Sequence, residues 1–376
     1  MNAVEIFLFV LAGLTVFYTS FLTRIHLGLM RISAHPSAGM MPRVTVIVAA
    51  RDEETNILPC MQSILAQDYP HNLLEIIVVD DESTDGTADV LRTLVARESR
   101  VRVFQVPPRP KGIIGRKPEA VALGVSQATG EIVVTTDADC RHASTWLSTM
   151  ISYFDPSTAL VAGPVVIAPG NSLFDSVERL DFLGLVTAGA GLIGAGRPII
   201  CNGANLAYRL SAYRTVQNRV QVSSNDDGTL MSRIVTQRVG SVRFAASPRA
   251  VVRTNPTGSI GNFFRQRTRW AAVRGRFLDW TIYAELVLLF LFFLALLAGF
   301  VLVIPQPLLL IPLGIVLAGK ALIDLFALRH GARICGMDVP ITSFLLAELF
   351  HAPSIVAATF LSVTAQFHWK GRHLSR

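Results

Sequence analysis

Acidic residues follow several short apolar runs in the first half of the chain. Asp80 and Asp81 follow one run, and Asp137 and Asp139 follow another with a single residue between them. Two carboxylates at this spacing can reach the same hard cation, and Mg²⁺ or Mn²⁺ prefers oxygen ligands. A cation bound there would neutralise a diphosphate and make it a better leaving group. A lone Asp-x-Asp is also a common acidic turn, so its meaning depends on the elements around it.

These acidic residues lie at the ends of predicted strands. Short β-branched runs alternate with segments of helical apolar spacing, which indicates an α/β domain with a mostly parallel central sheet. The predicted strands are Val44–Ala50, Leu74–Val79, Val101–Val106, Ile132–Thr136 and Ala159–Val165, and the predicted helices are Asn56–Ala66, Thr87–Val95, Pro118–Ala128 and Thr145–Phe154. Sheets of this kind bind ligands beyond the carboxyl ends of their strands. We therefore expect the acidic residues to share one crevice.

The composition places part of the chain in lipid. Of the 376 residues, 51% are apolar and 16% are charged, which is too apolar for two water-soluble domains. The apolar excess lies in four segments, Ala3–Leu22, Thr281–Ile304, Pro307–Leu328 and Pro340–Ala365, each long enough to span a bilayer. The net charge of +7 gathers beside these segments, which favours an anionic membrane surface over nucleic acid as the partner. The scattered cysteines are expected to be reduced packing residues.

Charges that flank the apolar segments predict the orientation in the membrane. Arg24 and Arg31 follow the first segment, which reads as an uncleaved anchor, and Arg329 and Arg333 lie between the last two. The positive-inside rule then puts the domain that follows the anchor in the cytoplasm. Four full crossings would leave the basic C-terminus outside, against that rule. Because Pro353 lies in the last segment, that segment either spans or is broken and re-entrant, and the sequence leaves this open.

Ionisable residues inside the apolar segments allow two interpretations. Glu348 and His351 either contact an acceptor headgroup or form a buried pair that stabilises a bend. Lys320 and Asp324, spaced four apart, are expected to neutralise each other. The run Gly189–Gly194 matches a dinucleotide fingerprint, but no strand leads into it, so we predict close packing of small residues.

Two further segments have helical patterns that allow a position at the membrane surface. Ser172 and Asp175 form a predicted capping box, and the helix that follows either lies on the membrane surface or covers the sheet. Residues Thr257–Phe277 mix aromatic and arginine side chains, which predicts an interfacial helix. Gln266 and Arg269 share a face of that helix, where Arg269 can donate paired hydrogen bonds to phosphate. The alternative is an arginine-rich helix resting on lipid headgroups.

The motifs, taken together and in order, resemble glycosyltransferase family 2, whose catalytic domain has the GT-A fold. The resemblance covers residues from Pro42 to Phe277, and the membrane segments fit in general plan. The motifs are TVIVAARDEE at Thr45–Glu54, IIVVDDESTDGT at Ile76–Thr87, GRKPEA at Gly115–Ala120, TTDADC at Thr135–Cys140, CNGANLAYR at Cys201–Arg209, NDDGTL at Asn225–Leu230 and QRTRW at Gln266–Trp270.

The resemblance implies a role for each matching residue. The nucleotide sugar would be bound by Ala50, Arg51, Glu53, Asp80, Asp81, Lys117 and Asp137, and the metal by Asp137 and Asp139. The acceptor side would include Asn202, Gly203, Asn205 and Asp226, and the catalytic residues would be Asp227, Gln266, Arg269 and Trp270. Trp270 would offer a flat face to a sugar or an acceptor chain. Asp227 would be the general base of a single displacement with inversion. The family often has Glu-Asp where this chain has Asp226-Asp227, which leaves the choice of base less certain.

The predicted organisation is a membrane anchor at 1–30, a cytoplasmic GT-A domain at 42–255, an interfacial helix with the Gln-x-x-Arg-Trp motif at 256–280 and membrane segments at 281–376. We predict a multi-pass protein of the inner membrane that transfers a hexose from a UDP-sugar or similar donor to a lipid, with a divalent cation as cofactor. The blend of motifs resembles that of bacterial lipid and carotenoid glycosyltransferases. The alternatives are a processive polysaccharide synthase and a nucleotide-sugar transporter or receptor without turnover.

Overall fold

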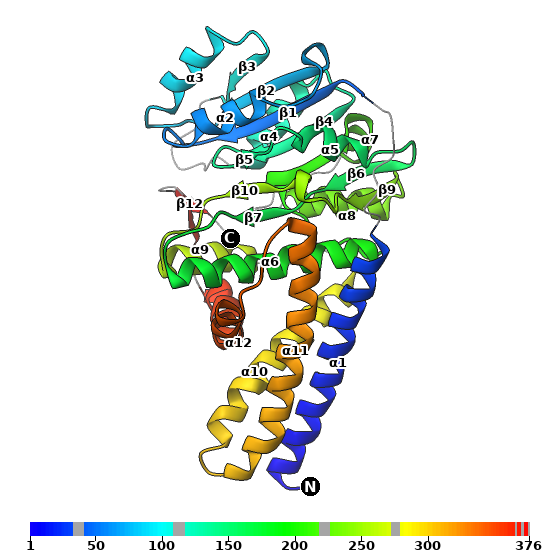
Figure 1. Cartoon of the computed structure of the whole chain (residues 1–376), viewed down its shortest axis with the longest axis vertical. Coiled ribbons are helices and arrows are strands. Elements are labelled where there is room, and N and C mark those ends of the chain that lie inside the picture. Colours follow the sequence, from blue (N-terminus) through cyan, green and yellow to red (C-terminus); the bar gives the residue numbers. More distant parts are fainter. Residues whose placement is uncertain are drawn as a thin grey trace.

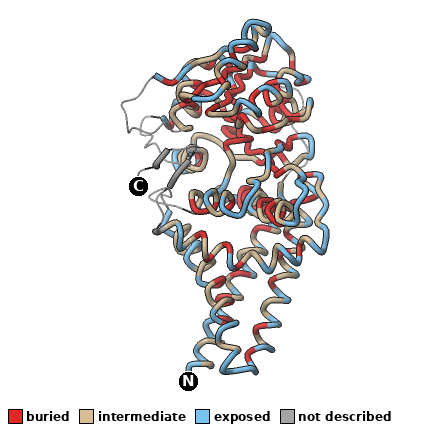
Figure 2. The backbone as a smooth tube through the Cα atoms, turned by 90° about the vertical axis from the view of Figure 1, so that its left-hand side faces the viewer, coloured by how far each residue is buried: buried red, intermediate tan, exposed pale blue. Residues whose placement is uncertain are grey.

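The computed structural model describes residues 1–32, 41–107, 117–217, 226–271, 279–364, 367–369 and 372–374. An α/β part lies at one end of the long axis and long helices lie at the other, with helix α6 (Leu173–Gly194) crossing between them (Figure 1). Buried residues concentrate in the α/β part, whereas the far ends of the long helices are mostly exposed (Figure 2). The main core therefore belongs to the α/β part.

The main sheet has seven strands in the order β3-β2-β1-β4-β8-β6-β9. They are β1 (Val44–Ala50), β2 (Leu74–Asp80), β3 (Val101–Gln105), β4 (Ile132–Asp137), β6 (Thr158–Ala162), β8 (Leu206–Arg209) and β9 (Ser241–Phe244). Strand β1 pairs in parallel with β2 and β4, whereas β8 runs antiparallel to β4 and β6. The prediction of a mostly parallel α/β sheet is confirmed, and β1 to β4 match the predicted strands to within one residue.

Helices cover both faces of this sheet. Side chains alternate along each strand, so each strand places apolar side chains on both faces. Val44, Val46 and Val48 of β1 share a core with α2 (Ile57–Leu65), α3 (Thr87–Val95) and α5 (Trp146–Ser152). On the other face, Ile47 and Ile77 share a core with α4 (Lys117–Gln127), α7 (Leu210–Val216) and α8 (Asp226–Thr236). Burial on both faces explains why the strands read as continuous apolar runs.

The predicted strand Ala159–Val165 is confirmed as far as Ala162, but its continuation is wrong, because two strands of different sheets share this segment. Strand β6 ends at Ala162, and β7 (Val165–Ile167) pairs with β10 (Val252–Thr254), which also pairs with β5 (Arg141–His142). Pro164 lies between β6 and β7 and has no amide hydrogen to donate to a neighbouring strand. Its carbonyl instead accepts a hydrogen bond from the backbone of Val252 at 3.0 Å.

Helix α6 joins the α/β part to the membrane helices. Ser172 and Asp175 form the predicted capping box at its start. Near its end, a Cβ added at Gly28 of α1 (Ala3–Arg31) would lie 1.9 Å from the carbonyl oxygen of Gly191, and one added at Gly194 would lie 2.1 Å from that of Gly28. The glycines therefore let the two backbones touch. This confirms close packing as the reason for the glycine-rich run.

Four helices are long and apolar enough to cross a membrane. They are α1, α10 (Trp280–Leu302), α11 (Leu310–Cys335) and α12 (Ile341–Thr364). Helices α1, α10 and α11 run along the long axis, whereas α12 is seen nearly end-on in Figure 1. It continues through Pro353 and packs against α6, α10 and the motif helix α9 (Ile260–Ala271).

The direction of α12 bears on the side at which the chain ends. Strands β11 (Phe367–Trp369) and β12 (Arg372–Leu374) form a hairpin, and β11 contacts α9 next to the α/β part. The last described strands therefore lie beside α9 and not at the far ends of α1, α10 and α11.

The expected Lys320–Asp324 ion pair is confirmed, and Glu348 and His351 join it in one cluster. The Lys320 Nζ atom donates to Asp324 Oδ2 at 2.7 Å and to Glu348 Oε2 at 2.6 Å, and lies 3.3 Å from His351 Nδ1. The Tyr18 hydroxyl donates to Asp324 Oδ1 at 2.6 Å. Each polar group in apolar surroundings needs a partner, and the contacts in this cluster supply one. Because the groups come from α1, α11 and α12, the cluster also joins these three helices.

We expect the Lys320→Met variant to unfold more readily, by about 3–5 kcal/mol, because removing one partner leaves buried carboxylates without a counter-charge. Thermal unfolding in detergent measures the change. Lys320→Arg, which keeps the charge, should lose less, and Leu322→Met, at a position 57% exposed on the same helix, should lose little. Equal stability of the Lys320→Met variant and the wild type would contradict this role.

Candidate active site

The turns that follow β1 and β2 bind each other and form one wall of the crevice. Asp52 and Glu82 have φ of +48° and +55°, in the left-handed region. The Asp52 carboxylate accepts a hydrogen bond from the backbone of Thr84 at 2.7 Å, and the Ser83 hydroxyl accepts one from the backbone of Asp52 at 3.0 Å. Mutual hydrogen bonds hold both turns in conformations that are otherwise unfavourable for residues with a Cβ.

The residues predicted to bind the nucleoside lie at this wall, mostly with buried side chains. The Arg51 guanidinium donates to the carbonyl oxygens of Asp81 and Glu82. Asp80 accepts a bond from the backbone of Ser83 at 3.1 Å, and the carbonyl oxygen of Ala50 accepts one from the backbone of Asp81 at 2.8 Å. Arg51, Asp80 and Asp81 are each at most 7% exposed. Their clearest role is therefore to shape the wall.

Glu53 lies on the same turn, and its backbone amide donates to the Thr87 hydroxyl at 2.8 Å. Its carboxylate accepts a hydrogen bond from Asn56 at 2.9 Å. This carboxylate is close enough to raise the pKa of Asp139. Glu53 therefore links the nucleoside wall to the Asp-x-Asp pair.

Asp137 ends β4 and forms an ion pair with Lys117 at the start of α4. Both side chains are about one-third exposed, so the pair faces the crevice. Burial disfavours the charged form of Lys117, but its pKa is raised because the carboxylates of Asp137 and Asp227 lie close by. A lysine that stays charged beside these two carboxylates can also neutralise phosphate.

Asp139 lies two residues after Asp137, and both side chains are partly buried. One of its oxygens accepts a hydrogen bond from the Thr254 hydroxyl at 3.0 Å. Burial raises the pKa of Asp139, and the neighbouring charges of Asp137 and Glu53 raise it further. A carboxylate held among like charges is stabilised when a cation joins it. The residues present therefore fit a divalent cation, with Asp137 and Asp139 as the ligands from this chain.

In the described part of the chain, the one group of three potential metal ligands is Asp324, Glu348 and His351, away from the Asp-x-Asp pair. The ammonium of Lys320 already lies among these three side chains. That membrane group is therefore satisfied without a metal ion.

Asp227 lies in the first turn of α8 and reaches the same crevice. A Cβ added to Gly203 would lie 2.2 Å from its carboxylate, so the glycine leaves the space that Asp227 occupies. Burial raises the pKa of Asp227 and the charge of Asp137 adds to this, whereas Lys117 and the Gly203 amide lower it. The three predicted carboxylates, at positions 137, 139 and 227, thus converge. The side chain of Asp226 lies outside the described part.

We expect transfer to fall at acidic pH, with a midpoint above the value of about 3.9 for an ordinary aspartate. A base acts in its ionised form, so activity is complete above the raised pKa of Asp227 and is lost as the pH falls through it. In Lys117→Met, loss of the nearby positive charge should move this acidic limb to higher pH. The pH profile of kcat/KM measures both effects, and a shift to lower pH would contradict the assignment.

The segment before β8 holds residues predicted for the acceptor side, and these residues differ in what their side chains contact. Asn202 accepts a hydrogen bond from the backbone of Ala204 at 3.0 Å and caps the short helix Gly203–Asn205. Asn205 is fully buried, accepts from Trp146 Nε1 at 2.9 Å, and donates to two carbonyl oxygens at 2.8 Å. All its amide atoms are used inside the protein. The predicted acceptor contact therefore does not fit Asn205, which holds the segment in place.

Helix α9 brings the Gln-x-x-Arg-Trp motif to the crevice. Burial lowers the pKa of Arg269, and the opposing effect of Asp137 shows that the guanidinium lies near that carboxylate. The Gln266 Oε1 atom is buried and has no hydrogen-bond partner in the described part of the chain. Residues 272–278, the last part of the predicted interfacial segment, lie outside the described residues. Arg269 is therefore the motif residue near the Asp-x-Asp pair.

Trp270 is packed rather than open. The Arg267 guanidinium lies 4.5 Å from the centroid of its ring, and the Phe182 ring lies 5.7 Å away. Arg267 also pairs with Asp181 of α6. The predicted flat face for a sugar or an acceptor chain is thus partly covered, and Trp270 fixes α9 on α6.

Several residues that build the site were not singled out from sequence. Thr254 binds Asp139, and the buried Glu178 accepts hydrogen bonds from the backbone of Thr257 at 3.2 Å. Asp181 and Arg267 complete the attachment of α9 to α6. Glu178 and Asp181, spaced three apart on one helix, were the available signal for polar contacts with a neighbouring element.

Comparison with known proteins agrees with this arrangement of strands and acids. A family model described as Glycosyl transferase family 2 matches residues 45–215, and one described as Glycosyl transferase family group 2 matches residues 132–326. The second match covers more than half of the 376 residues. The chain therefore belongs to the family 2 group of glycosyltransferases.

Individual relatives are more distant. An N-acetylglucosaminyltransferase of Rhizobium meliloti is 28% identical over 241 residues, which is 61% of this chain and 55% of the relative. A beta-monoglucosyldiacylglycerol synthase of Synechocystis sp. is 33% identical over 117 residues, 31% of this chain and 24% of the relative. The chain thus spans at most about half the length of these two relatives.

A solved structure extends the comparison to the fold. The mannosyltransferase PcManGT from Pyrobaculum calidifontis, in complex with GDP-Man and Mn²⁺, superposes with a TM-score of 0.53 and 19% identity. The match covers 94% of this chain and 99% of that one. The chain therefore has the predicted GT-A fold.

Proposed function

We propose that this protein is an inverting glycosyltransferase that moves a hexose from a nucleotide diphosphate sugar to a lipid hydroxyl at the cytoplasmic membrane face. The observation that carries the proposal is the Lys117–Asp137 ion pair, with Asp139, Asp227 and Arg269 near enough to Asp137 for their charges to interact with it. In this combination a carboxylate can accept the proton of the acceptor hydroxyl, and the cationic side chains can stabilise the leaving diphosphate.

The reaction follows from the positions of these groups. Asp227 accepts the proton of the acceptor hydroxyl while that oxygen attacks the anomeric carbon from the face opposite the diphosphate. The bond from this carbon to the diphosphate oxygen breaks, and its electrons leave with the nucleotide. Lys117 and Arg269 are placed to stabilise the charge that develops on the leaving group. A Mg²⁺ or Mn²⁺ ion held by Asp137 and Asp139 would supply Lewis-acid stabilisation of the diphosphate. One displacement without an enzyme nucleophile inverts the anomeric configuration.

Three features support a lipid acceptor. Helix α9 contributes to the crevice and also packs against α12, one of the four helices long enough to span a membrane. Phe263 of α9 and Phe174 of α6 both contact Phe350 of α12, so aromatic packing ties the motif helix to a helix long enough to span a membrane. The beta-monoglucosyldiacylglycerol synthase relative is named for a lipid product. A lipid hydroxyl could thus reach Asp227 without leaving the bilayer.

Mass analysis of lipids tests the function directly. Purified protein in vesicles made from bacterial lipid extract, given a radiolabelled UDP-hexose and Mn²⁺, should produce a lipid that is heavier by one hexose. Other nucleotide donors are tried in parallel. A long labelled polymer would instead indicate a processive polysaccharide synthase. Failure to transfer with every donor, together with tight donor binding, would indicate a transporter or receptor.

A further inference from the structure

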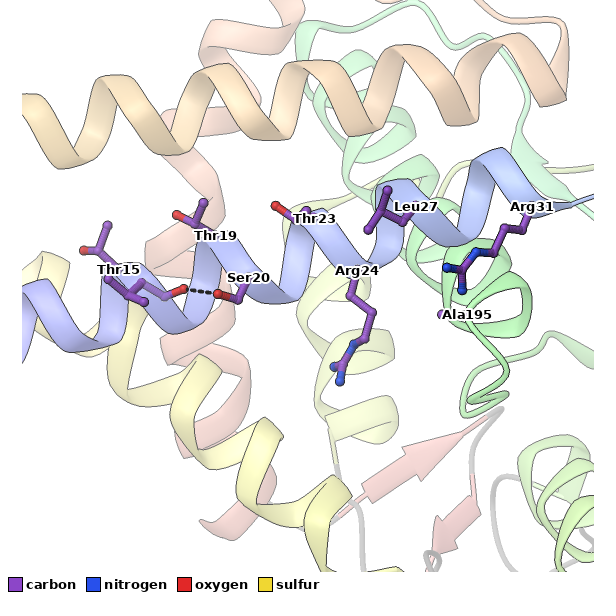
Figure 3. A pocket seen from close by; sticks show the side chains of 9 residues that line it. Thr15, Thr19, Ser20, Thr23, Arg24, Leu27, Arg31 and Ala195 are labelled. Atoms are coloured by element: carbon purple, nitrogen blue, oxygen red, sulfur yellow. Dashed lines mark hydrogen bonds between the residues drawn. The ribbon is translucent and has the colours of Figure 1, made fainter.

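A groove of about 630 Å³ runs along the membrane-facing surface of α1, apart from the active site. It is lined by one face of α1 and by Ala195 after the end of α6 (Figure 3). Its lining residues are Thr15, Val16, Thr19, Ser20, Thr23, Arg24, Leu27, Arg31 and Ala195. Hydroxyl side chains are prominent in this lining, although lipid-facing positions are normally apolar.

We propose that this groove binds an anionic diacyl phospholipid of the leaflet next to the α/β part. The phosphate would lie at Arg24 and Arg31, the ester carbonyls would meet the threonine hydroxyls, and one acyl chain would continue along α1. The inference rests on the membrane location proposed above, but not on the transfer reaction.

Two of the threonine hydroxyls in the groove have no hydrogen-bond acceptor among the described residues. Thr15 and Ser20 donate to carbonyl oxygens of their own helix, each at 2.7 Å. Thr19 and Thr23 make no hydrogen bond with any described residue and are exposed. An unsatisfied donor in hydrocarbon costs free energy, because no water is there to accept the bond. The carbonyl oxygens of a glycerolipid would satisfy both threonines.

The arginines supply charge at one end of the groove. Arg24 pairs with Glu285 at 3.0 Å, and Arg197 pairs with the same carboxylate at 2.6 Å and with Asp279 at 3.7 Å. Arg31 is exposed and has no ion-pair partner in the described part of the chain. Arg24 and Arg197 thus face two carboxylates, whereas Arg31 keeps its positive charge for a phosphate. Figure 3 shows Arg24 and Arg31 extending from the same side of α1.

The length of the groove agrees with one leaflet. Arg24 and Thr15 are nine positions apart on a helix, which corresponds to a rise of about 14 Å. Half of a hydrocarbon core of about 30 Å is about 15 Å. A headgroup at Arg24 therefore places one acyl chain beside the threonines within a single leaflet.

Native mass spectrometry of the delipidated full-length protein tests the proposal, with phosphatidylglycerol and phosphatidylcholine as probes. We expect phosphatidylglycerol to bind at least tenfold more tightly than phosphatidylcholine. Thr19→Trp, which fills the groove, and Arg31→Gln, which removes the free cation, should each weaken phosphatidylglycerol binding about tenfold. Leu322→Trp, at a lipid-facing position of α11, and Arg329→Gln, at an exposed arginine on the same helix, are the matched controls.

Several results would overturn the proposal. Equal binding of both probes, or unchanged binding in Thr19→Trp and Arg31→Gln, would show that the groove selects no anionic lipid. Disruption of a dimer by Thr19→Trp would show that a second copy of the chain covers it. Conversion of a co-purified lipid to its glycoside on addition of donor, prevented by Thr19→Trp, would make the groove the acceptor site instead. Sugar transfer measured in parallel keeps these outcomes separate from failure of the proposed function.

Discussion

Asparagine in place of Asp227 is expected to lower the rate of sugar transfer by about 10²–10⁴-fold, the range that a positioned general base contributes. The amide cannot accept the hydroxyl proton, yet it has nearly the shape of the carboxylate that lies over Gly203. Donor binding should be kept, because the nucleoside wall and the Asp-x-Asp pair are unchanged. Initial rates with labelled donor and a separate measurement of donor affinity test both parts.

Asp226→Asn is the matched control for this experiment, because the neighbouring carboxylate is the other candidate for the base. It should retain far more activity than Asp227→Asn. A reversed order would move the base to Asp226. Full activity of both variants would remove the need for a base and favour a protein that binds nucleotide sugars without turnover.

Asp139→Asn is expected to reduce transfer at least a hundredfold and to weaken cation-dependent donor binding. A metal ion that neutralises a diphosphate contributes several kcal/mol to the transition state, and each 1.4 kcal/mol corresponds to about a factor of ten. The Asp139 carboxylate is held in place by a hydrogen bond from the Thr254 hydroxyl, so its loss removes a positioned oxygen ligand.

Manganese binding followed by electron paramagnetic resonance measures this loss apart from activity. Asp89→Asn, at a carboxylate 70% exposed on α3, should bind manganese like the wild type. Chelation of divalent cations should inactivate the wild type reversibly. Activity that survives both chelation and Asp139→Asn would show that Lys117 and Arg269 alone neutralise the diphosphate.

The sequence by itself determined the first half of the α/β part. Strands β1, β2 and β4 are buried on both faces, so their apolar runs and the acidic residues that follow are a local signal. The carboxyl ends of β1, β2 and β4 had to meet once those strands were parallel neighbours. The four apolar segments were equally readable, because length and hydropathy suffice to recognise a possible membrane helix.

Tertiary structure alone decided which motif residues face the crevice. Asn205 and Trp270 belong to recognisable motifs, but their side chains pack against Trp146 and Phe182, which lie elsewhere in the chain. A motif reports which residues occur together and not where each side chain points. Contacts between residues far apart in sequence fix those directions, and no local pattern encodes them.

The long apolar helices show the same contrast between what the sequence predicts and what packing decides. Spacing along one helix predicted that Lys320 and Asp324 would pair, but Glu348 and Tyr18 join them from two other helices. The steep direction of α12 was also hidden, since apolar length is the same for a helix that spans and one that crosses its neighbours. Composition and periodicity are properties of single segments, so they determined which helices form. The packing of side chains between helices determined how those helices are arranged.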